Sequence, residues 1–377
     1  MNSHYKNGLI AGMMAVSIAA AGPSRAQAVH TDNQSVGIEI SPTHRAANAG
    51  DGYWTAERMR NATPLNIVIE NQPFQHNDLE PEQPIGEPEA VEGTKPLLQK
   101  SSLGGKQLYI PQADDSFSNE LPETNDSAPL EAVLTQFQDR PHPFTGHEVL
   151  DSYEQYPLQT IGKVFFTQGG ADYVCSASAL VSDNQRLVVT AGHCVHRGDG
   201  FTWSANVRFV PAYRYGAAPF GMWQACGLYT TYNWYNFGDI AHDLGAIKVC
   251  DQNDGTRLHE VVGSLGYLVN VSRTQHWNSF GYPAAEPFNG ETLNTCQASH
   301  GRDDTVMQPM TLGIGCNMTG GSSGGPWILE TQRQGTSGNY LNGVNSYGYG
   351  SLPNVMFSPY FGDGFIHLRD FAIGDGA

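Results

Sequence analysis

Short apolar runs rich in Val, Ile, Phe and Tyr follow one another from Tyr156 onward, and Gly, Asn and Asp separate them. The clearest runs are 160–167, 176–182, 186–192, 206–215, 244–250, 310–315, 326–330 and 341–349. Many short strands in close succession with turn residues between them are typical of antiparallel sandwiches and barrels. We therefore predict an all-β fold for this part of the chain, with one short helix near the C-terminus at 365–373.

The first residues have the order of a secretory signal peptide. Lys6 precedes an apolar run from Leu9 to Ala21, and small residues lead to Ala28. This order predicts a signal peptide over 1–28 that is removed on export. The run is shorter than the roughly 20 apolar residues of a membrane span, so we expect no membrane anchor after signal cleavage. We predict a secreted, extracellular protein, with the periplasm as the alternative.

The segment from Val29 to Glu154 is acidic and rich in proline. It holds 21 Asp and Glu against 7 Lys and Arg, in a chain whose net charge is -17. Such a composition buries too little apolar surface to offset its ordering entropy. We predict a partly disordered pro-segment over 29–154, and the alternative is a flexible extension that stays attached.

Because phosphate binding needs clustered Lys and Arg, nucleic acid is excluded as a partner. We expect a monomer.

All six cysteines lie between Cys175 and Cys316. An even number of cysteines in an exported chain predicts a disulfide framework. We predict sequential pairing: Cys175 with Cys194, Cys226 with Cys250, and Cys296 with Cys316. The alternative is a metal site, but the chain has no CxxC pair.

Two segments offer an imidazole and a carboxylate that can act together. His193 follows the strand-like run of "LVVTAGHC", and Asp243 begins "DLGAIKVC". Burying a carboxylate at the start of a strand costs free energy unless a hydrogen-bond donor stabilises its charge. An imidazole N–H is such a donor. Asp239 is the rival carboxylate, but the residues after it do not continue as a strand. We interpret Asp239 as a turn residue and favour Asp243.

The stretch "GGSSGGPW" at 320–327 is a candidate nucleophile loop. Acyl transfer needs a rigidly held hydroxyl, a nearby base and backbone N–H groups aimed at the developing oxyanion. Gly321 allows positive φ, so its N–H and that of Ser323 can point into one pocket. The alternative is a flexible Gly/Ser linker, but a linker would not run directly into Pro-Trp-Ile-Leu.

The motifs "TAGHC", "HDLGAIKV" and "GGSSGGP", in this order, closely resemble those of the chymotrypsin-like (trypsin-like) serine endopeptidases, especially the bacterial glutamyl endopeptidase branch. The resemblance covers about 156–377. It implies two antiparallel six-stranded β-barrels, at about 155–255 and 256–377, with the site in the cleft between them. It also implies that Cys175 and Cys194 form the disulfide of the histidine loop.

The resemblance implies a role for each motif residue. His193 would be the general base, Asp243 the carboxylate that orients it, and Ser323 the nucleophile, with the amides of Gly321 and Ser323 as oxyanion hole. Protein or peptide substrates follow from these roles, and no cofactor or metal is implied.

Two features depart from the family pattern. Ser322 stands where the animal digestive enzymes carry an Asp that binds the new amino terminus, so that activation switch is expected to be absent. The specificity pocket would be formed by Asn317, Met318, Asn345, Ser346, Tyr347 and Gly348. None of these residues is charged, so cleavage after Arg or Lys is not expected. The pocket favours an uncharged side chain, and Glu held by hydrogen bonds alone is the alternative.

Two other function classes compete with an endopeptidase. A chymotrypsin-like fold with an idle cleft could be a binding or toxin-like module, although idle relatives usually lose a catalytic residue and here all three are present. A metallohydrolase is disfavoured because the chain has no HExxH motif among its 13 histidines. We interpret His242, His259 and His300 as structural. A Ca²⁺ ion bound at the acidic turn 250–255 is an alternative that the sequence leaves open.

Overall fold

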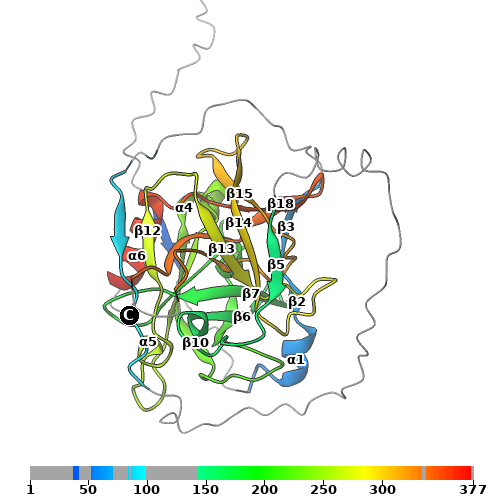
Figure 1. Cartoon of the computed structure of the whole chain (residues 1–377). Helices are drawn as coiled ribbons and strands as arrows, with labels where there is room; N and C mark the ends of the chain where they lie inside the picture. Colours follow the sequence, from blue (N-terminus) through cyan, green and yellow to red (C-terminus); the bar gives the residue numbers. More distant parts are fainter. Residues whose placement is uncertain are drawn as a thin grey trace, which may run out of the picture. The chain divides into compact units, whose positions relative to one another are not determined.

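The computed structural model describes residues 37–41, 52–70, 84, 86–98, 143–332 and 337–374. The predicted signal peptide over 1–28 lies outside these residues. Residues from Val36 onward form one compact unit, and its strands build two sheets (Figure 1). The prediction of a mainly β protein is confirmed.

The first sheet closes into a barrel of six strands. These are β6 (Ile161–Gln168), β7 (Ala171–Ala179), β8 (Leu187–Thr190), β9 (Ala205–Pro211), β10 (Trp223–Thr231) and β11 (Gly245–Val249). Neighbours in the order β10-β11-β8-β7-β6-β9 pair antiparallel, and β9 pairs back onto β10. The pairing of β9 with β10 leaves these six strands without a free edge at that point.

The strands of the barrel are buried on both faces. Along β6, Val164 and Phe166 pack into one core cluster, whereas Ile161 and Phe165 pack into another that includes Phe280 of the second sheet. Successive side chains of a strand point to opposite faces, so one face fills the barrel and the other packs against the second sheet. This packing explains why β6 carries large apolar side chains on both of its faces.

The second sheet is built by the later strands. They are β12 (Gly266–Val269), β13 (His276–Gly281), β14 (Asn294–Asp304), β15 (Thr311–Gly315), β16 (Pro326–Leu329), β17 (Tyr340–Val344), β18 (Tyr347–Tyr349) and β19 (Leu352–Ser358), paired in the order β18-β19-β15-β14-β13-β16-β17-β12. The predicted C-terminal helix is present as α6 (Asp363–Gly374). Its buried residues Phe365, Leu368 and Ala372 join the core that the two sheets share.

Short helical segments connect the strands. They are η2 (Leu158–Thr160), α3 (Gly192–Val195), α4 (Tyr232–Phe237), η3 (Ile240–His242) and α5 (Leu258–Val262). Among the described residues, no helix is long and apolar enough to cross a membrane. The cysteines pair in chain order, as Cys175–Cys194, Cys226–Cys250 and Cys296–Cys316.

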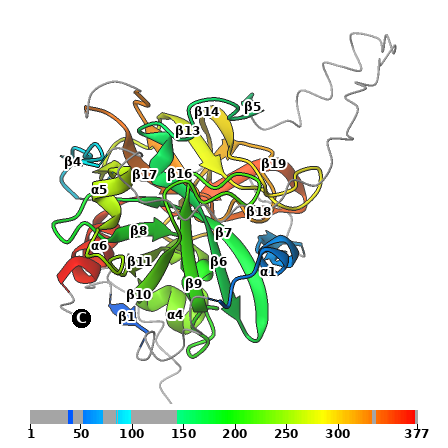
Figure 2. The ribbon, with the colours of Figure 1, turned by 90° about the horizontal axis from the view of Figure 1, so that it is seen from below.

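The described part of the acidic segment contains one helix and five short strands, and each of these strands pairs with a strand of the two sheets. Figure 2 labels α1, β1, β4 and β5 among them. The helix is α1 (Ala56–Asn61), capped by the Thr55 hydroxyl. The strands are β1 (Ile38–Ile40) on β10, β2 (Thr63–Pro64) on β7, β3 (Ile67–Ile69) on β18, β4 (Glu89–Val91) on β12, and β5 (Thr145–Glu148) on β14. Large parts of the acidic segment therefore pack on the sheets that follow it in the chain.

Candidate active site

His193 lies in the single turn of α3, directly after β8. The disulfide between Cys194 and Cys175 ties this turn to β7. The preceding residue has no room for a side chain, because a Cβ on Gly192 would lie 2.8 Å from Trp234 and 2.9 Å from Asp243. The sequence "AGHC" therefore brings the backbone of this turn close to Asp243.

Asp243 is fully buried and binds both the backbone and the ring of His193. Its Oδ1 accepts the His193 backbone N–H at 2.7 Å, and its Oδ2 lies 2.8 Å from the ring Nδ1. The hydroxyl of Ser346 donates to the same Oδ2 at 2.6 Å. Three donors at one buried carboxylate stabilise its charge and fix the orientation of the imidazole.

The rival carboxylate binds a different histidine. Asp239 caps η3, and its Oδ2 lies 2.9 Å from Nδ1 of His242, on a partly exposed turn. The structure thus pairs His193 with Asp243, and it places Asp239 in a turn. The resemblance predicts Ser346 in the specificity pocket, but its hydroxyl bonds Asp243 instead, and no local pattern indicates this contact.

Ser323 lies in the loop between β15 and β16. Gly321 and Gly324 have φ of +92° and +79°, and a Cβ on Gly324 would lie 2.0 Å from the Thr190 hydroxyl. Only glycine adopts this conformation in so little space. Ser322 donates to the Thr319 carbonyl at 2.7 Å and is buried, so no carboxylate is needed at this position to hold the loop.

Asn345 connects this loop to the strands behind it. Its side-chain amide donates to the carbonyls of Ser322 and Phe280, each at 3.1 Å, and its side-chain oxygen accepts from Trp327 at 2.8 Å. Asn345 was expected to line the specificity pocket, but it is fully buried. Its contacts stabilise the nucleophile loop.

A cavity of about 210 Å³ lies next to the loop and is lined by Asn317, Met318 and Gly348 among others. None of its described lining residues is charged. Of the six residues expected in the pocket, these three line it. Tyr347 instead bonds Asp304 at 2.6 Å, and the residue before it, Ser346, bonds Asp243. The Ser346 and Tyr347 hydroxyls are thus bound by two buried carboxylates, and of the run 345–348 only Gly348 lines the cavity.

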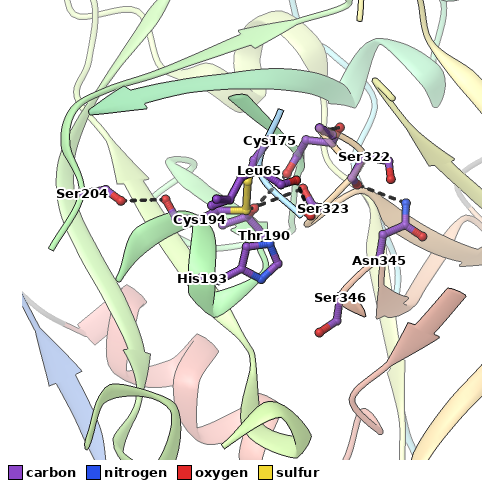
Figure 3. Close-up of a disulfide and its surroundings, with 12 residues drawn as sticks. Leu65, Cys175, Thr190, His193, Cys194, Ser204, Ser322, Ser323, Asn345 and Ser346 are labelled. Atoms are coloured by element: carbon purple, nitrogen blue, oxygen red, sulfur yellow. Dashed lines mark hydrogen bonds between the residues drawn. A yellow bond between two sulfur atoms is a disulfide. The ribbon is translucent and has the colours of Figure 1, made fainter. Parts of the chain in front are cut away.

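A residue of the acidic segment lies against the nucleophile loop. The Leu65 carbonyl accepts a hydrogen bond from the Gly321 N–H at 2.9 Å and from the Ser323 hydroxyl at 3.2 Å (Figure 3). Within the described part of the chain, Nε2 of His193 is buried without a hydrogen-bond partner. Sequence reasoning did not find Leu65, because only the fold brings it here from more than 250 positions away.

Cys175, His193 and Cys194 bring potential metal-ligand atoms within 4.8 Å of one another. Both sulfurs belong to one disulfide, so neither can supply the thiolate that a metal would bind. This donor set does not fit a metal ion.

No protein-family model matches the chain. Over 89 residues the chain is 32% identical to a protein of Bacillus subtilis (strain 168) named extracellular metalloprotease, and this match spans 24% of the chain and 26% of that relative. The crystal structure of the protease Anisep from Arthrobacter nicotinovorans is 42% identical with a TM-score of 0.56, and the match covers 61% of this chain and 100% of Anisep.

A second solved structure gives a similar result. The thermostable serine protease AL20 from an extremophilic microorganism is 42% identical with a TM-score of 0.53, over 58% of this chain and 98% of AL20. Because the chain covers these two proteases almost completely at this identity, and because it folds into the barrel-and-sheet arrangement described above, it belongs to the chymotrypsin-like serine proteases.

Proposed function

We propose that the protein is made as the precursor of a secreted endopeptidase and that it hydrolyses peptide bonds through an acyl-enzyme on Ser323. The observation that carries the proposal is the 2.8 Å contact between His193 Nδ1 and the buried carboxylate of Asp243. This contact leaves Nε2 of His193 available as the base. Signal cleavage, secretion and processing of the acidic segment are parts of the same proposal.

In the proposed reaction, His193 takes the proton of the Ser323 hydroxyl as its Oγ attacks the substrate carbonyl. The imidazolium then gives this proton to the leaving amine, and water releases the acyl group in a second round. Asp243 stays ionised and stabilises the imidazolium. The backbone N–H groups of Gly321 and Ser323 bind the oxyanion, and the left-handed φ of Gly321 supports this role.

We propose that the residue before the scissile bond is uncharged. Support comes from the cavity beside the nucleophile loop, whose described lining offers amide, hydroxyl and apolar groups but no charge. A charged side chain would lose hydration there without gaining an ion pair. Profiling a peptide library that varies this position tests the proposal, and a strong preference for Arg would contradict it.

A fluorophosphonate probe tests the chemistry directly, because it reacts with an activated serine whatever the substrate preference. We expect the purified protein to be labelled, Ser323→Ala to abolish labelling, and the matched neighbour Ser322→Ala to retain it. If the correctly folded, processed protein is not labelled, we would infer that it is a catalytically idle binding module. Amino-terminal sequencing of the secreted form checks the proposed processing.

A further inference from the structure

Residues Thr63–Ile69, which we call the strap, bind across the nucleophile loop. Thr63 and Pro64 pair with Tyr173 and Val174 of β7, and Ile67–Ile69 pair with Tyr347–Tyr349 of β18. Both pairings are parallel. The carbonyl of Leu65, in the middle of the strap, accepts the N–H of Gly321 and the hydroxyl of Ser323.

The chemistry of the site fixes the direction in which a substrate must run. His193 has to protonate the leaving amine, and this amine belongs to the residue after the scissile carbonyl. The C-terminal part of a substrate therefore extends to the His193 side, where the Cys175–Cys194 disulfide ties β7 to the histidine turn. The N-terminal part extends to the other side, over β18.

The strap runs the other way. Its N-terminal residues lie on β7, on the His193 side, and its C-terminal residues lie on β18. Asn66, whose nitrogen would be the leaving group, lines the uncharged cavity with Asn317 and Met318. The described lining of the second cavity, beside His193 and Trp234, includes Leu65 and Ile67 but not Asn66.

We propose that the strap fills the cleft with a chain direction opposite to that of a substrate, and so blocks Ser323 without being cleaved. The proposal rests on the function proposed above. Leu65 places its carbonyl where the oxyanion would form, and this carbonyl accepts the hydrogen bond that the Ser323 hydroxyl should donate to His193. The bond between Leu65 and Asn66 persists because its nitrogen lies away from the only proton donor the reaction provides.

Residues 54–61, which we call the anchor, lie outside the cleft and set this direction. Trp54 is 4% exposed and donates its ring N–H to the Asn206 carbonyl at 2.6 Å, and Met59 of α1 is 3% exposed. Arg58 binds the carboxylate of Asp172 through two nitrogens, each at 2.9 Å. Since α1 ends two residues before Thr63, the anchor holds the N-terminal end of the strap against the β7 side.

The direction can be tested without any activity, in the full chain carrying Ser323→Ala. Val68 and Gly348 are register partners, and a Cβ on Gly348 would have 3.3 Å to its nearest neighbour. We expect Val68→Cys with Gly348→Cys to form a new disulfide in at least about tenfold higher yield than Val68→Cys with Tyr173→Cys, because only adjacent Cα atoms can be bridged.

Peptide mapping by mass spectrometry measures both yields, and the three native disulfides in the same digest report correct folding. A strap in the substrate direction would place Val68 on β7. A predominant link between positions 68 and 173 would therefore overturn the proposal.

The block itself is tested by loosening the anchor in the full chain. We expect Trp54→Ala to raise the rate at which a fluorophosphonate labels Ser323 by about a hundredfold, because truncation of a buried Trp costs much of the docking free energy. Leu97→Ala is the matched control, since Leu97 belongs to the same acidic segment but is 73% exposed. It should leave the labelling rate unchanged.

Equal labelling of the two variants would show that the strap does not block the site. An intact mass showing cleavage of the wild-type chain between Leu65 and Asn66 would also overturn the proposal. If the link between positions 68 and 348 forms but no variant is ever labelled, the reversed direction holds and the proposed peptidase function fails.

Discussion

The catalytic side chains and the strap across them are held by different kinds of contact. Asp243 is fully buried and accepts three hydrogen bonds, and the nucleophile loop is tied to Asn345 and Thr319. The strap pairs through its backbone with two strands, its Ile67 and Ile69 are only partly buried, and its Val68 is 40% exposed. The contacts that hold Asp243 and the nucleophile loop do not involve the strap, so we expect them to persist when the strap is displaced.

The largest expected effect concerns the contact between Asp243 and His193. We expect Asp243→Asn to lower kcat for a peptide substrate by about 10⁴-fold, because an amide no longer holds the required imidazole tautomer or stabilises the imidazolium. Asp239→Asn is the matched control and should be mild, since Asp239 binds His242. Steady-state kinetics of the processed enzyme measure both. The reverse order of effects would mean that the wrong carboxylate has been assigned.

The second-largest effect concerns the Cys175–Cys194 disulfide of the histidine turn. Cys175→Ala with Cys194→Ala should lower the free energy of unfolding by about 3 kcal/mol, because the bridge closes a loop of 19 residues. Cys226→Ala with Cys250→Ala removes a disulfide that closes a loop of 24 residues, and it should lower the free energy of unfolding by a similar amount. Denaturant titrations measure both changes. Only the first pair should also lower kcat, and equal kcat values would show that the disulfide does not position His193.

A smaller effect is expected from the hydroxyl that supports Asp243. Ser346→Ala removes a 2.6 Å hydrogen bond to this carboxylate. We expect kcat to fall about tenfold, corresponding to roughly 1.5 kcal/mol for a bond to a charged group, with KM nearly unchanged. Ser279→Ala removes a comparable bond to Asn345 and should affect stability rather than kcat. A rise in KM alone would assign Ser346 to the substrate pocket.

The smallest effect at neutral pH concerns His259, a buried histidine of α5. His259 lies 3.1 Å from the Leu187 carbonyl through Nε2, and burial lowers its pKa from 6.5 to about 4. The unfolded chain therefore binds this proton at higher pH than the folded one, so stability is full above pH 6.5 and falls as pH decreases towards 4.

His259→Gln keeps a donor for Leu187 and does not titrate. We expect the free energy of unfolding to depend less on pH between 6.5 and 4 in this variant, with only a small change at pH 7. Chemical denaturation at a series of pH values measures the slope. An unchanged slope would show that other groups cause the acid sensitivity.

The local patterns of the sequence predicted much of this molecule. The runs that became β6, β8 and β11 carry apolar residues at successive positions, such as Val164 to Phe166 and Leu187 to Val189, because both faces of the barrel strands are buried. Other strands were not singled out: β14 (Asn294–Asp304) contains "SHGRDD" and reads as a polar loop. It forms a strand because its backbone pairs with β13 and β15 on either side, and local propensity carries no record of such pairing.

The available chemistry could be predicted from residue types alone: a histidine beside a cysteine, an aspartate before a strand, and a serine among glycines that allow positive φ. These signals depend on residue type and nearby spacing. Tertiary structure decided which groups meet. It directs Ser346 to Asp243, assigns Asn345 to the nucleophile loop, and brings Leu65 to Ser323 across more than 250 residues. Such contacts follow from the packing of distant strands, which no local pattern encodes.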